Sequence, residues 1–308
     1  MKFRKAILLL SVLILGLSLF AASYGVFSNA SNNRNLEFIS WSGEEVELYG
    51  DGLYKNDSVS GAEQEIAQDI VTLALGIPFL LLSLLLVGGG SIRGRFLLAG
   101  TLGYFLYTYA SYSFLSTYNS FFLVYVFVMS ASFFAFLLTL MSFDLQTLKN
   151  HFQARTPVKF IGGLLIFIGG AVLLMWLSRI LPSLVTDKVP YGLDHYTTLV
   201  IQALDIGFIV PGGIVAGILL IKRNAFGYLL APVFVIKGVT LLTAITMMSI
   251  RMRIAGVETS LVEIVLFTIF NMVIFYALFL ILKNIKEPTS RTGNRKMTRK
   301  KRKEKWIS

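Results

Sequence analysis

The chain has 308 residues, of which 55% are hydrophobic and only 15% are charged, and its mean hydropathy is +0.71. A soluble domain carries about 25% charged residues, and here the apolar residues fall in long blocks typical of membrane spans. The sequence contains no cysteine, which excludes disulfides, cysteine-ligated zinc, iron–sulfur clusters and a lipid-anchored lipoprotein.

The net charge of +11 is distributed unevenly along the chain. Residues 28–69 hold nine acids and two bases, which gives a charge of −7. Residues 286–308 hold ten bases and two acids, which gives a charge of +8. This asymmetry is more informative than the overall charge.

Long apolar segments recur through the chain. A helix needs about 20 apolar residues to cross the hydrocarbon core of a bilayer. The sequence therefore predicts an all-α fold, a polytopic transmembrane helix bundle with about eight spans. In chain order, the expected spans are Ile7–Phe27, Ile70–Val87, Phe96–Leu115, Phe121–Phe143, Phe160–Leu181, Thr197–Ile221, Phe226–Ile250 and Ile264–Leu282.

The first of these segments has two interpretations. Lys2, Arg4 and Lys5 form a positive start, and Ala21-Ala22-Ser23 resembles a signal-peptide cleavage site. However, the apolar run covers about 20 residues, whereas the apolar region of a signal peptide covers about 7–15. We therefore expect an uncleaved membrane anchor, with a cleaved signal peptide as the alternative.

Lys and Arg in the short loops predict the orientation, because cytoplasmic loops carry an excess of them. If the N-terminus is inside, most of the basic loop residues lie in inner loops. Arg251 and Arg253 are an exception, because they fall in an outer loop. The inside still has the excess, which predicts a multi-pass protein of the cell membrane with both termini in the cytoplasm. The basic residues assigned to inner loops are Arg93, Arg95, Lys149, Arg155, Lys159, Lys222 and Arg223, and those assigned to other outer loops are Arg34, Lys55 and Lys188.

The pattern of spans and charges divides the chain into four parts. A membrane anchor over residues 1–27 precedes an acidic extracytoplasmic segment over residues 28–69. A seven-span membrane bundle over residues 70–285 precedes a basic cytoplasmic tail over residues 286–308.

The outer segment is too short to form a stable core of its own without disulfides. Residues 60–69 are expected to form a helical entry into the second span. The remainder suggests a short hairpin that lies on the membrane domain. Its apolar residues are Trp41, Val46, Leu48, Tyr49 and Leu53.

Two parts of the chain show a weak internal similarity. Gln68-Asp69-Ile70 and Pro78 precede one pair of spans, and Leu204-Asp205-Ile206 and Pro211 precede another. Each group is followed by two basic residues and by Leu-Leu-Ala, at 97–99 and 229–231. The similarity predicts a 4+4 parallel repeat, as some transporters have, with chance similarity between apolar hairpins as the alternative.

Asp205 is the most informative residue, because it lies about eight residues, or roughly 12 Å, into its expected span. A carboxylate at that depth is costly unless it is paired, hydrated or protonated, so it indicates either a functional site or a structural hydrogen bond. Lys237 in the next span is the obvious partner, although the two residues are offset by about 9 Å along a regular hairpin. Direct pairing would need a break in the first of these helices, for which Pro211, Gly212 and Gly213 provide the expected hinge.

Other polar residues in the spans extend this candidate site. Gln202 lies one turn from Asp205, and Asn271 lies at a similar depth in the last span. A second set shares one face of the third span at i, i+3, i+4 and i+7 spacing, where it could line a cavity or join helices. That set is Tyr104, Tyr107, Thr108 and Ser111.

The basic tail is expected to bind anionic lipid headgroups, at about 1 kcal/mol per basic residue near the surface. We expect no nucleic acid, because aromatic residues for base stacking are absent from the tail apart from Trp306. We also expect no cofactor, no metal site and no catalytic residues, since the chain has only two histidines and no complete motif. The tail residues that carry the lipid prediction are Arg299, Lys300, Lys301, Arg302 and Lys303.

Several short stretches carry a resemblance to known sequences. They are Tyr49-Gly50-Asp51-Gly52-Leu53-Tyr54 with Asp57-Ser58, Arg93-Gly94-Arg95-Phe96-Leu97-Leu98-Ala99-Gly100, residues 104–109, Tyr118-Asn119, Ala203-Leu204-Asp205 and Gly227-Tyr228-Leu229-Leu230-Ala231-Pro232. Over most of the chain from Tyr49 to Lys237, the sequence resembles an uncharacterised family of multi-spanning integral membrane proteins of bacteria and archaea. The resemblance implies the topology and adds no activity.

Three functions are compatible with these features. The leading prediction is a transporter or permease-like protein in which Asp205 is a proton or cation site and Lys237 is its charge partner or a substrate contact. The alternative is a non-enzymatic sensor, scaffold or accessory subunit, with a protein partner at the outer segment. A membrane enzyme that acts on lipid comes last, because the chain lacks clustered acids or histidines in the spans.

Overall fold

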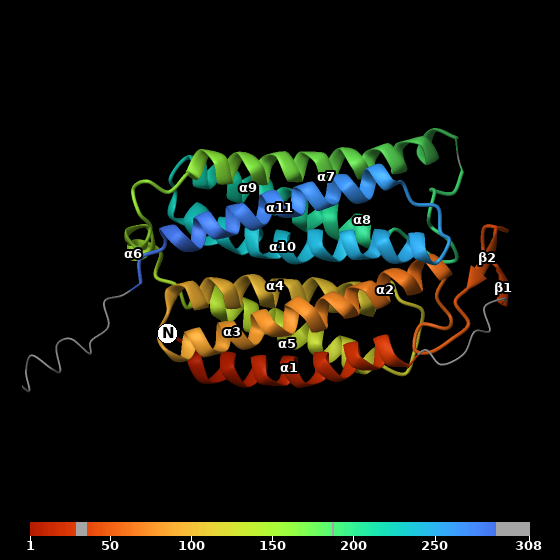
Figure 1. Ribbon diagram of the computed structural model, residues 1–308, viewed down its shortest axis with the longest axis horizontal. Helices are drawn as coiled ribbons and strands as arrows, with labels where there is room; N and C mark the ends of the chain where they lie inside the picture. Colours follow the sequence, from red (N-terminus) through yellow and green to blue (C-terminus); the bar gives the residue numbers. More distant parts are fainter. Residues whose placement is uncertain (29–35, 187, 288–308) are drawn as a thin grey trace, which may run out of the picture.

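The structure is a computed structural model that describes residues 1–28, 36–186 and 188–287. It consists almost entirely of helices that run along one axis of the molecule (Figure 1). The helices are α1 (Arg4–Phe27), α2 (Val59–Val71), α3 (Ile77–Gly88), α4 (Ile92–Phe114), α5 (Phe122–Met141), α6 (Leu145–Leu148), α7 (Val158–Thr186), α8 (Val200–Leu204), α9 (Val210–Ile221), α10 (Ala225–Ile254) and α11 (Leu261–Asn284). One hairpin joins the strands β1 (Leu36–Ile39) and β2 (Glu45–Leu48), and a short 3-10 turn covers Lys149–His151.

Seven of the described helices are long and apolar enough to cross a membrane, where α2–α3 and α8–α9 each count as one continuous helix. This confirms an all-α bundle of a multi-pass membrane protein. The eighth expected span corresponds to α4, which is 23 residues long but is not among the seven. Arg93, Arg95 and the polar stripe make α4 less apolar than the seven candidate spans.

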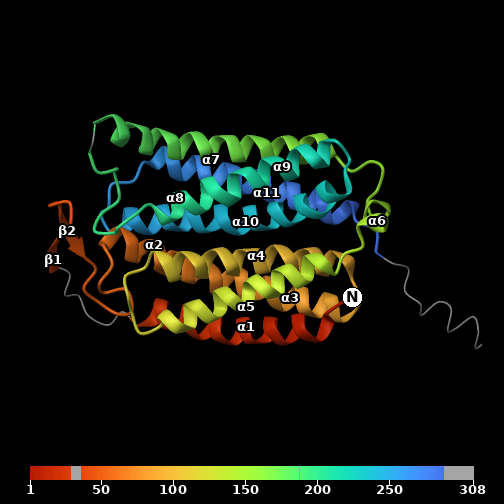
Figure 2. The ribbon, with the colours of Figure 1, turned by 180° about the vertical axis from the view of Figure 1, so that it is seen from behind.

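The long helices form two units that lie side by side (Figures 1 and 2). The first unit contains α1 to α5 and the second contains α7 to α11. One apolar core lies within the first unit, and the other joins the second unit to the first half of α4. The units meet where α10 packs against α2 and α4. At this junction a Cβ added to Gly100 would lie 2.4 Å from Cβ of Ile236, so the small residue lets α4 and α10 approach closely.

Both units contain a helix that is interrupted by a π-helical turn. Thr72–Gly76 separates α2 from α3, and Asp205–Ile209 separates α8 from α9. In each case a proline follows the turn by two residues, Pro78 and Pro211. A proline offers no N–H, so the wider π turn accommodates the change in hydrogen bonding. The shared order of elements agrees with the predicted 4+4 repeat.

The expected hinge is displaced from its predicted position. The irregular turn covers residues 205–209, and Pro211, Gly212 and Gly213 belong to the regular helix α9. Gly212 has a packing role, because an added Cβ would lie 2.4 Å from the ring of Phe234 on α10. The sequence prediction located the proline correctly and placed the irregular turn a few residues too late.

The outer segment forms the predicted hairpin and helical entry. Trp41 follows β1, and its indole Nε1 donates a hydrogen bond to the carbonyl of Tyr196 at 3.0 Å. Tyr49 and Leu53 lie after β2 and are buried in the core of the first unit. Residues 59–71 form α2, which confirms the helical entry and extends the second helix beyond the predicted start at Ile70.

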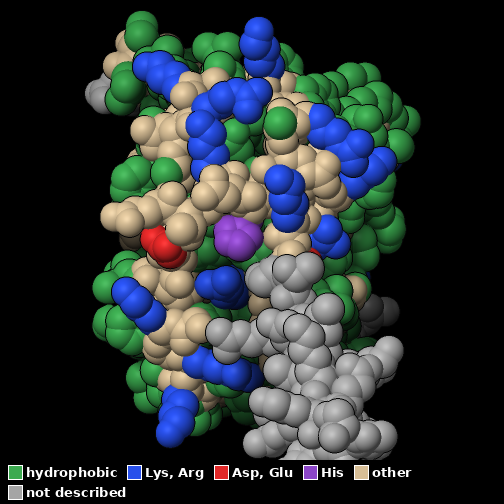
Figure 3. Space-filling view, turned by 90° about the vertical axis from the view of Figure 1, so that its left-hand side faces the viewer, with side chains coloured by type: hydrophobic (Ala, Val, Ile, Leu, Met, Phe, Trp, Pro, Cys, Tyr) green, Lys and Arg blue, Asp and Glu red, His purple; other side chains and the backbone are tan. Residues whose placement is uncertain are grey.

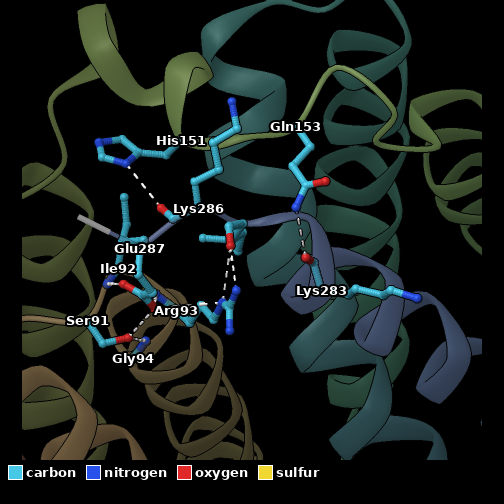
Figure 4. Close-up of polar contacts among 10 residues, drawn as sticks. Ser91, Ile92, Arg93, Gly94, His151, Gln153, Lys283, Lys286 and Glu287 are labelled. Carbon is cyan, nitrogen blue, oxygen red and sulfur yellow. Dashed lines mark hydrogen bonds and ion pairs between the residues drawn. The ribbon is translucent and has the colours of Figure 1, made fainter. Parts of the chain in front are cut away.

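The opposite end of the bundle is rich in exposed Lys and Arg (Figure 3). The chain leaves α11 here and is held by Glu287 (Figure 4). The Glu287 carboxylate accepts hydrogen bonds from the Ser91 hydroxyl at 2.6 Å and from the backbone N–H groups of Ile92 and Arg93 at 2.8 and 3.2 Å. Although partial burial opposes ionisation, these hydrogen bonds lower the pKa of Glu287. The contact fastens the end of the second unit to the first turn of α4.

The backbones of α7 and α9 approach closely where the two helices cross. A Cβ added to Gly217 would lie 2.5 Å from the carbonyl oxygen of Gly162. We therefore expect Gly217→Ala to lower the free energy of unfolding by about 1–3 kcal/mol, since the helices must separate. Unfolding in mixed SDS micelles measures this, with Gly163→Ala as the control, because no atom lies within 4 Å of a Cβ added there. Equal stability of the two variants would contradict the close crossing.

Candidate functional site

Asp205 begins the π-helical turn between α8 and α9 and is only 6% exposed. Its Oδ1 accepts a hydrogen bond from the Tyr107 hydroxyl of α4 at 2.7 Å. Its Oδ2 accepts a hydrogen bond from the indole Nε1 of Trp176 on α7 at 2.8 Å. Both carboxylate oxygens therefore have a donor, and the donors come from both helix units.

Lys237 approaches the same tyrosine from α10. Its Nζ lies 3.8 Å from the centroid of the Tyr107 ring, which is a cation–π contact, and the residue is 5% exposed. Within the described part of the chain, Nζ has no hydrogen-bond partner. A buried ammonium without hydrogen bonds is costly, so the aromatic face and the nearby Asp205 charge supply its stabilisation.

The two charged residues meet through Tyr107. The described residues contain no ion pair between Asp205 and Lys237, so the direct contact considered from the sequence is not made. The helical offset explains this, because a regular hairpin places the two side chains about 9 Å apart along its axis. The Tyr107 ring spans the gap, with its hydroxyl on the carboxylate and its face toward the ammonium.

The remaining residues of the predicted cluster do not join this site. Asn271 on α11 donates a hydrogen bond from Nδ2 to Thr243 of α10 at 3.1 Å, which fastens those two helices together. Gln202 precedes Asp205 in α8, is half-buried and makes no side-chain hydrogen bond to it within the described residues. These residues are better explained as parts of helix packing than as parts of a charged site.

The polar stripe of α4 is divided between the two units. Tyr104 and Thr108 both accept hydrogen bonds from Nε2 of Gln68 on α2, at 2.8 and 2.9 Å. Ser111 donates to the carbonyl of Thr108 within α4 at 2.7 Å. Tyr107 alone turns toward the second unit. The stripe was predicted as one surface, but the structure places α4 between two polar networks.

Trp176 is the site residue that the sequence interpretation missed. It lies within α7 and is one of three tryptophans in the chain. Trp176 lies five residues before the end of the expected span Phe160–Leu181, where an interfacial tryptophan is the ordinary expectation. Its indole N–H needs an acceptor when it is buried, and this requirement was the available signal.

The donors around Asp205 determine what the site can hold. Hydrogen-bond donors from a hydroxyl and an indole occupy the two carboxylate oxygens, and a lysine lies nearby. No group of three or more histidine, cysteine or acidic residues is arranged for a metal ion in the described ranges. The arrangement is suited to gaining and losing a proton.

Comparison of the chain with protein families, with curated protein sequences and with solved structures finds no significant match. The resemblance to an uncharacterised membrane protein family therefore stays a prediction. The function must be argued from the geometry of the site.

Proposed function

We propose that this protein is a proton-coupled membrane transporter in which Asp205 binds and releases the coupling proton. The single observation that carries the proposal is the contact of Asp205 and Lys237 with the two sides of Tyr107 at the junction of the two helix units. Buried charges within membrane spans are costly and are retained mainly at sites of function. Helix interruptions and repeated units, as found here, are also features of transporter folds.

The chemistry of the site favours a proton over a metal cation. Hard cations prefer several oxygen ligands, whereas Asp205 already accepts hydrogen bonds from a hydroxyl and an N–H group. A second positive charge would also be repelled by the Lys237 ammonium. Protonation needs only one carboxylate oxygen and no new ligands.

Protonation of Asp205 provides a way to couple charge to movement. The negative carboxylate is held by Tyr107 from the first unit and by Trp176 from the second. Neutralising it weakens both charge-assisted hydrogen bonds and removes the counter-charge of Lys237. The contact between α4 and the second unit then becomes less favourable, which allows the units to move relative to one another.

The proposal includes an orientation in the cell membrane. The end of the bundle that carries α6 presents exposed basic residues, and we assign it to the cytoplasmic side with both termini (Figure 3). The five basic tail residues expected to bind anionic headgroups, which lie between Arg299 and Lys303, fall outside the described residues. Their lipid contact is part of the proposal.

We expect Asp205→Asn to abolish proton-coupled flux, because asparagine keeps the shape of the side chain but cannot bind a proton at neutral pH. The protein is reconstituted in vesicles that contain a pH-sensitive dye, and amino acids, sugars, nucleosides and organic cations are added in turn. The wild type should change the lumenal pH with at least one class of solute. Tyr107→Phe should reduce that signal, since it keeps the ring over Lys237 but loses the hydrogen bond to Asp205.

Asp144→Asn is the matched control, because Asp144 is exposed and caps the short helix α6. Its flux should equal that of the wild type. A signal that persists in folded Asp205→Asn protein, or the absence of any solute that produces an Asp205-dependent signal, would contradict the proposal.

The exposed hairpin favours a second candidate function, that of an accessory or sensor protein. Leu36 and Ile39 of β1 are 55% and 69% exposed, and Glu45 and Glu47 of β2 are also exposed. Apolar and acidic groups together at one end of a molecule are suited to a protein partner. For such a protein, the intact chain should show no proton flux. Deletion of residues 36–48 should abolish binding of the partner while the bundle stays folded.

A further inference from the structure

Three further carboxylates are buried at the end of the bundle that carries the hairpin (Figure 1). Asp57 precedes α2, and Glu65 and Asp69 lie within it. They are 1%, 7% and 1% exposed, respectively. Neither the proposed transport site nor the prediction of intramembrane residues includes them.

The hydrogen bonds that reach these carboxylates come from neutral donors. Asp57 Oδ1 accepts from the backbone N–H of Thr117 at 2.8 Å and from the Tyr196 hydroxyl at 3.0 Å. Glu65 Oε1 accepts from the Ser116 hydroxyl. None of these donors carries a positive charge that would offset the burial of the carboxylates.

Asp69 is enclosed in the same way. Its Oδ2 accepts from the Tyr54 hydroxyl at 2.6 Å, and its Oδ1 accepts from the Tyr112 hydroxyl at 3.1 Å. On the α1 side, Gly25 leaves the space for it, since an added Cβ would lie 1.8 Å from Oδ2. Two tyrosine hydroxyls therefore contact the Asp69 carboxylate, and the lack of a side chain at Gly25 provides the space for it.

The charged groups on neighbouring elements are directed to other partners. Arg251 of α10 forms an ion pair with Glu63 at 2.6 Å. His195 hydrogen-bonds to Thr117 through Nε2 at 3.1 Å, so it faces Asp57 from the loop before α8. Asp194 of that loop accepts from the Ser58 hydroxyl at 2.6 Å. Except for His195, the described residues place no cationic side chain beside the three carboxylates.

Polar atoms buried in this cluster lack hydrogen-bond partners among the described residues. Glu65 Oε2 and the Tyr125 hydroxyl of α5 are both enclosed and have no hydrogen-bond partner among the described residues. Tyr125 is 1% exposed, its ring packs edge to face on Tyr112, and its hydroxyl lies within electrostatic reach of Glu65 and Asp69. An enclosed acceptor and an enclosed hydroxyl without partners are costly unless something binds between them.

We propose that this cluster is a second proton-binding site, in which Asp57 and Glu65 share one proton taken from the solution on the hairpin side. The two carboxyls repel one another when both are charged, and a shared proton removes that repulsion. The proton resides on Glu65 Oε2, the oxygen without another partner. The site does not depend on the transport proposal.

A proton fits the cluster better than a metal ion. Tyrosine and serine hydroxyls already donate to four of the six carboxylate oxygens, which directs their protons toward the acids. The described residues contain no arrangement of three or more acidic or histidine ligands for a metal. Two neighbouring carboxyls that share a proton require no further ligand.

The direction of the pH effect follows from Asp57. Burial raises the pKa of its carboxyl above the ordinary value. A carboxyl whose pKa is higher in the folded than in the unfolded protein stabilises the fold while it is protonated, and this stabilisation is lost as the pH rises through the raised pKa. The folded protein should therefore be more stable on the acidic side of that transition.

The test compares thermal unfolding of the full chain in lipid nanodiscs between pH 5 and pH 9. The melting temperature of the wild type should fall as the pH rises. Glu65→Gln carries a permanent neutral group, so it should remove most of that fall and melt roughly 2–4 °C above the wild type at pH 8. Glu44→Gln, an exposed change in the hairpin, is the matched control and should keep the wild-type pH dependence.

Infrared difference spectroscopy across the same pH range provides a readout that a packing effect would not produce. The wild type should show loss of a protonated carboxyl band on raising the pH, and Glu65→Gln should lack it. If Glu65→Gln does not fold, Asp57→Asn tests the same shared proton. An unchanged pH dependence in a folded variant, or stabilisation of the wild type but not of the variant by sodium or calcium, would overturn the proposal.

Discussion

Replacing Arg251 by methionine is expected to lower the free energy of unfolding by about 3–5 kcal/mol. The Arg251 guanidinium lies 2.6 Å from Oε2 of Glu63, and the Glu63 side chain is only 4% exposed. Methionine keeps much of the length of arginine but removes its charge and donors. The Glu63 carboxylate then stays buried without the charge of Arg251, and a buried charge that has lost its ion-pair partner destabilises the folded protein.

The position of this pair increases its importance. Arg251 belongs to α10 of the second unit and Glu63 belongs to α2 of the first, so the contact joins the two units near the hairpin end. Unfolding in mixed SDS micelles gives the free energy, and chemical cross-linking between α2 and α10 reports whether the units separate. Arg253→Met is the matched control, because Arg253 is exposed and its guanidinium donates to the carbonyl of Thr259.

The double variant Arg251→Met with Glu63→Gln separates charge from packing. Glutamine removes the buried carboxylate, so the double variant should recover at least half of the stability lost in the single Arg251→Met variant. Equal losses for Arg251→Met and Arg253→Met would contradict the role of the pair. The pair also bears on the exception to the expected charge distribution, since Arg251 is paired with an acid of α2.

The second large effect concerns the charges at the candidate transport site. We expect Asp205→Asn and Lys237→Met each to lower the free energy of unfolding by about 2–4 kcal/mol, because each leaves the other charge buried. The double variant should lose less than the sum of the two single losses, with a coupling free energy of at least about 1 kcal/mol. A double-mutant cycle in mixed SDS micelles measures this coupling.

A matched cycle tests whether Tyr107 carries the coupling. In a Tyr107→Leu background, neither the hydrogen bond to Asp205 nor the ring beneath Lys237 exists, so the coupling between the two charges should fall. The pair Thr243 and Asn271 is a neutral control on α10 and α11, with an expected coupling below about 1 kcal/mol. Additive losses for Asp205 and Lys237 would show that the two residues do not act as one charged site.

The sequence by itself determined the class of the protein. Each long apolar run became a helix, because a segment without enough polar groups has to satisfy its backbone internally in a membrane. The same rule does not give exact boundaries, so the helical segment predicted from Ile70 begins at Val59, where Ser58 caps the first turn. The sequence also predicted an interruption of the helix that contains Pro211, whereas it did not predict the π turn before Pro78.

Sequence periodicity located the polar residues but not their partners. The spacing of the α4 stripe correctly put Tyr104 and Thr108 on one face, yet it gave no sign that Tyr107 would turn to another unit. Similarly, Asp205 and Lys237 were recognised by their cost in a membrane, whereas Trp176 was not. Partners across helices depend on crossing angles and rotations that no single segment encodes.

The acids of the outer segment show most clearly which properties the sequence determined and which properties the packing decided. From the sequence they form part of a stretch with a charge of −7, for which solvent exposure is the ordinary expectation. The hairpin residues Glu44, Glu45 and Glu47 are indeed exposed, whereas Asp57 and Glu65 are buried. Composition and hydropathy thus determined which segments enter the membrane, because that choice depends on each segment alone. Only the packing of α2 against α1 and α10, with its hydrogen bonds to α4, decided which charges are enclosed, because burial depends on neighbours distant in the chain.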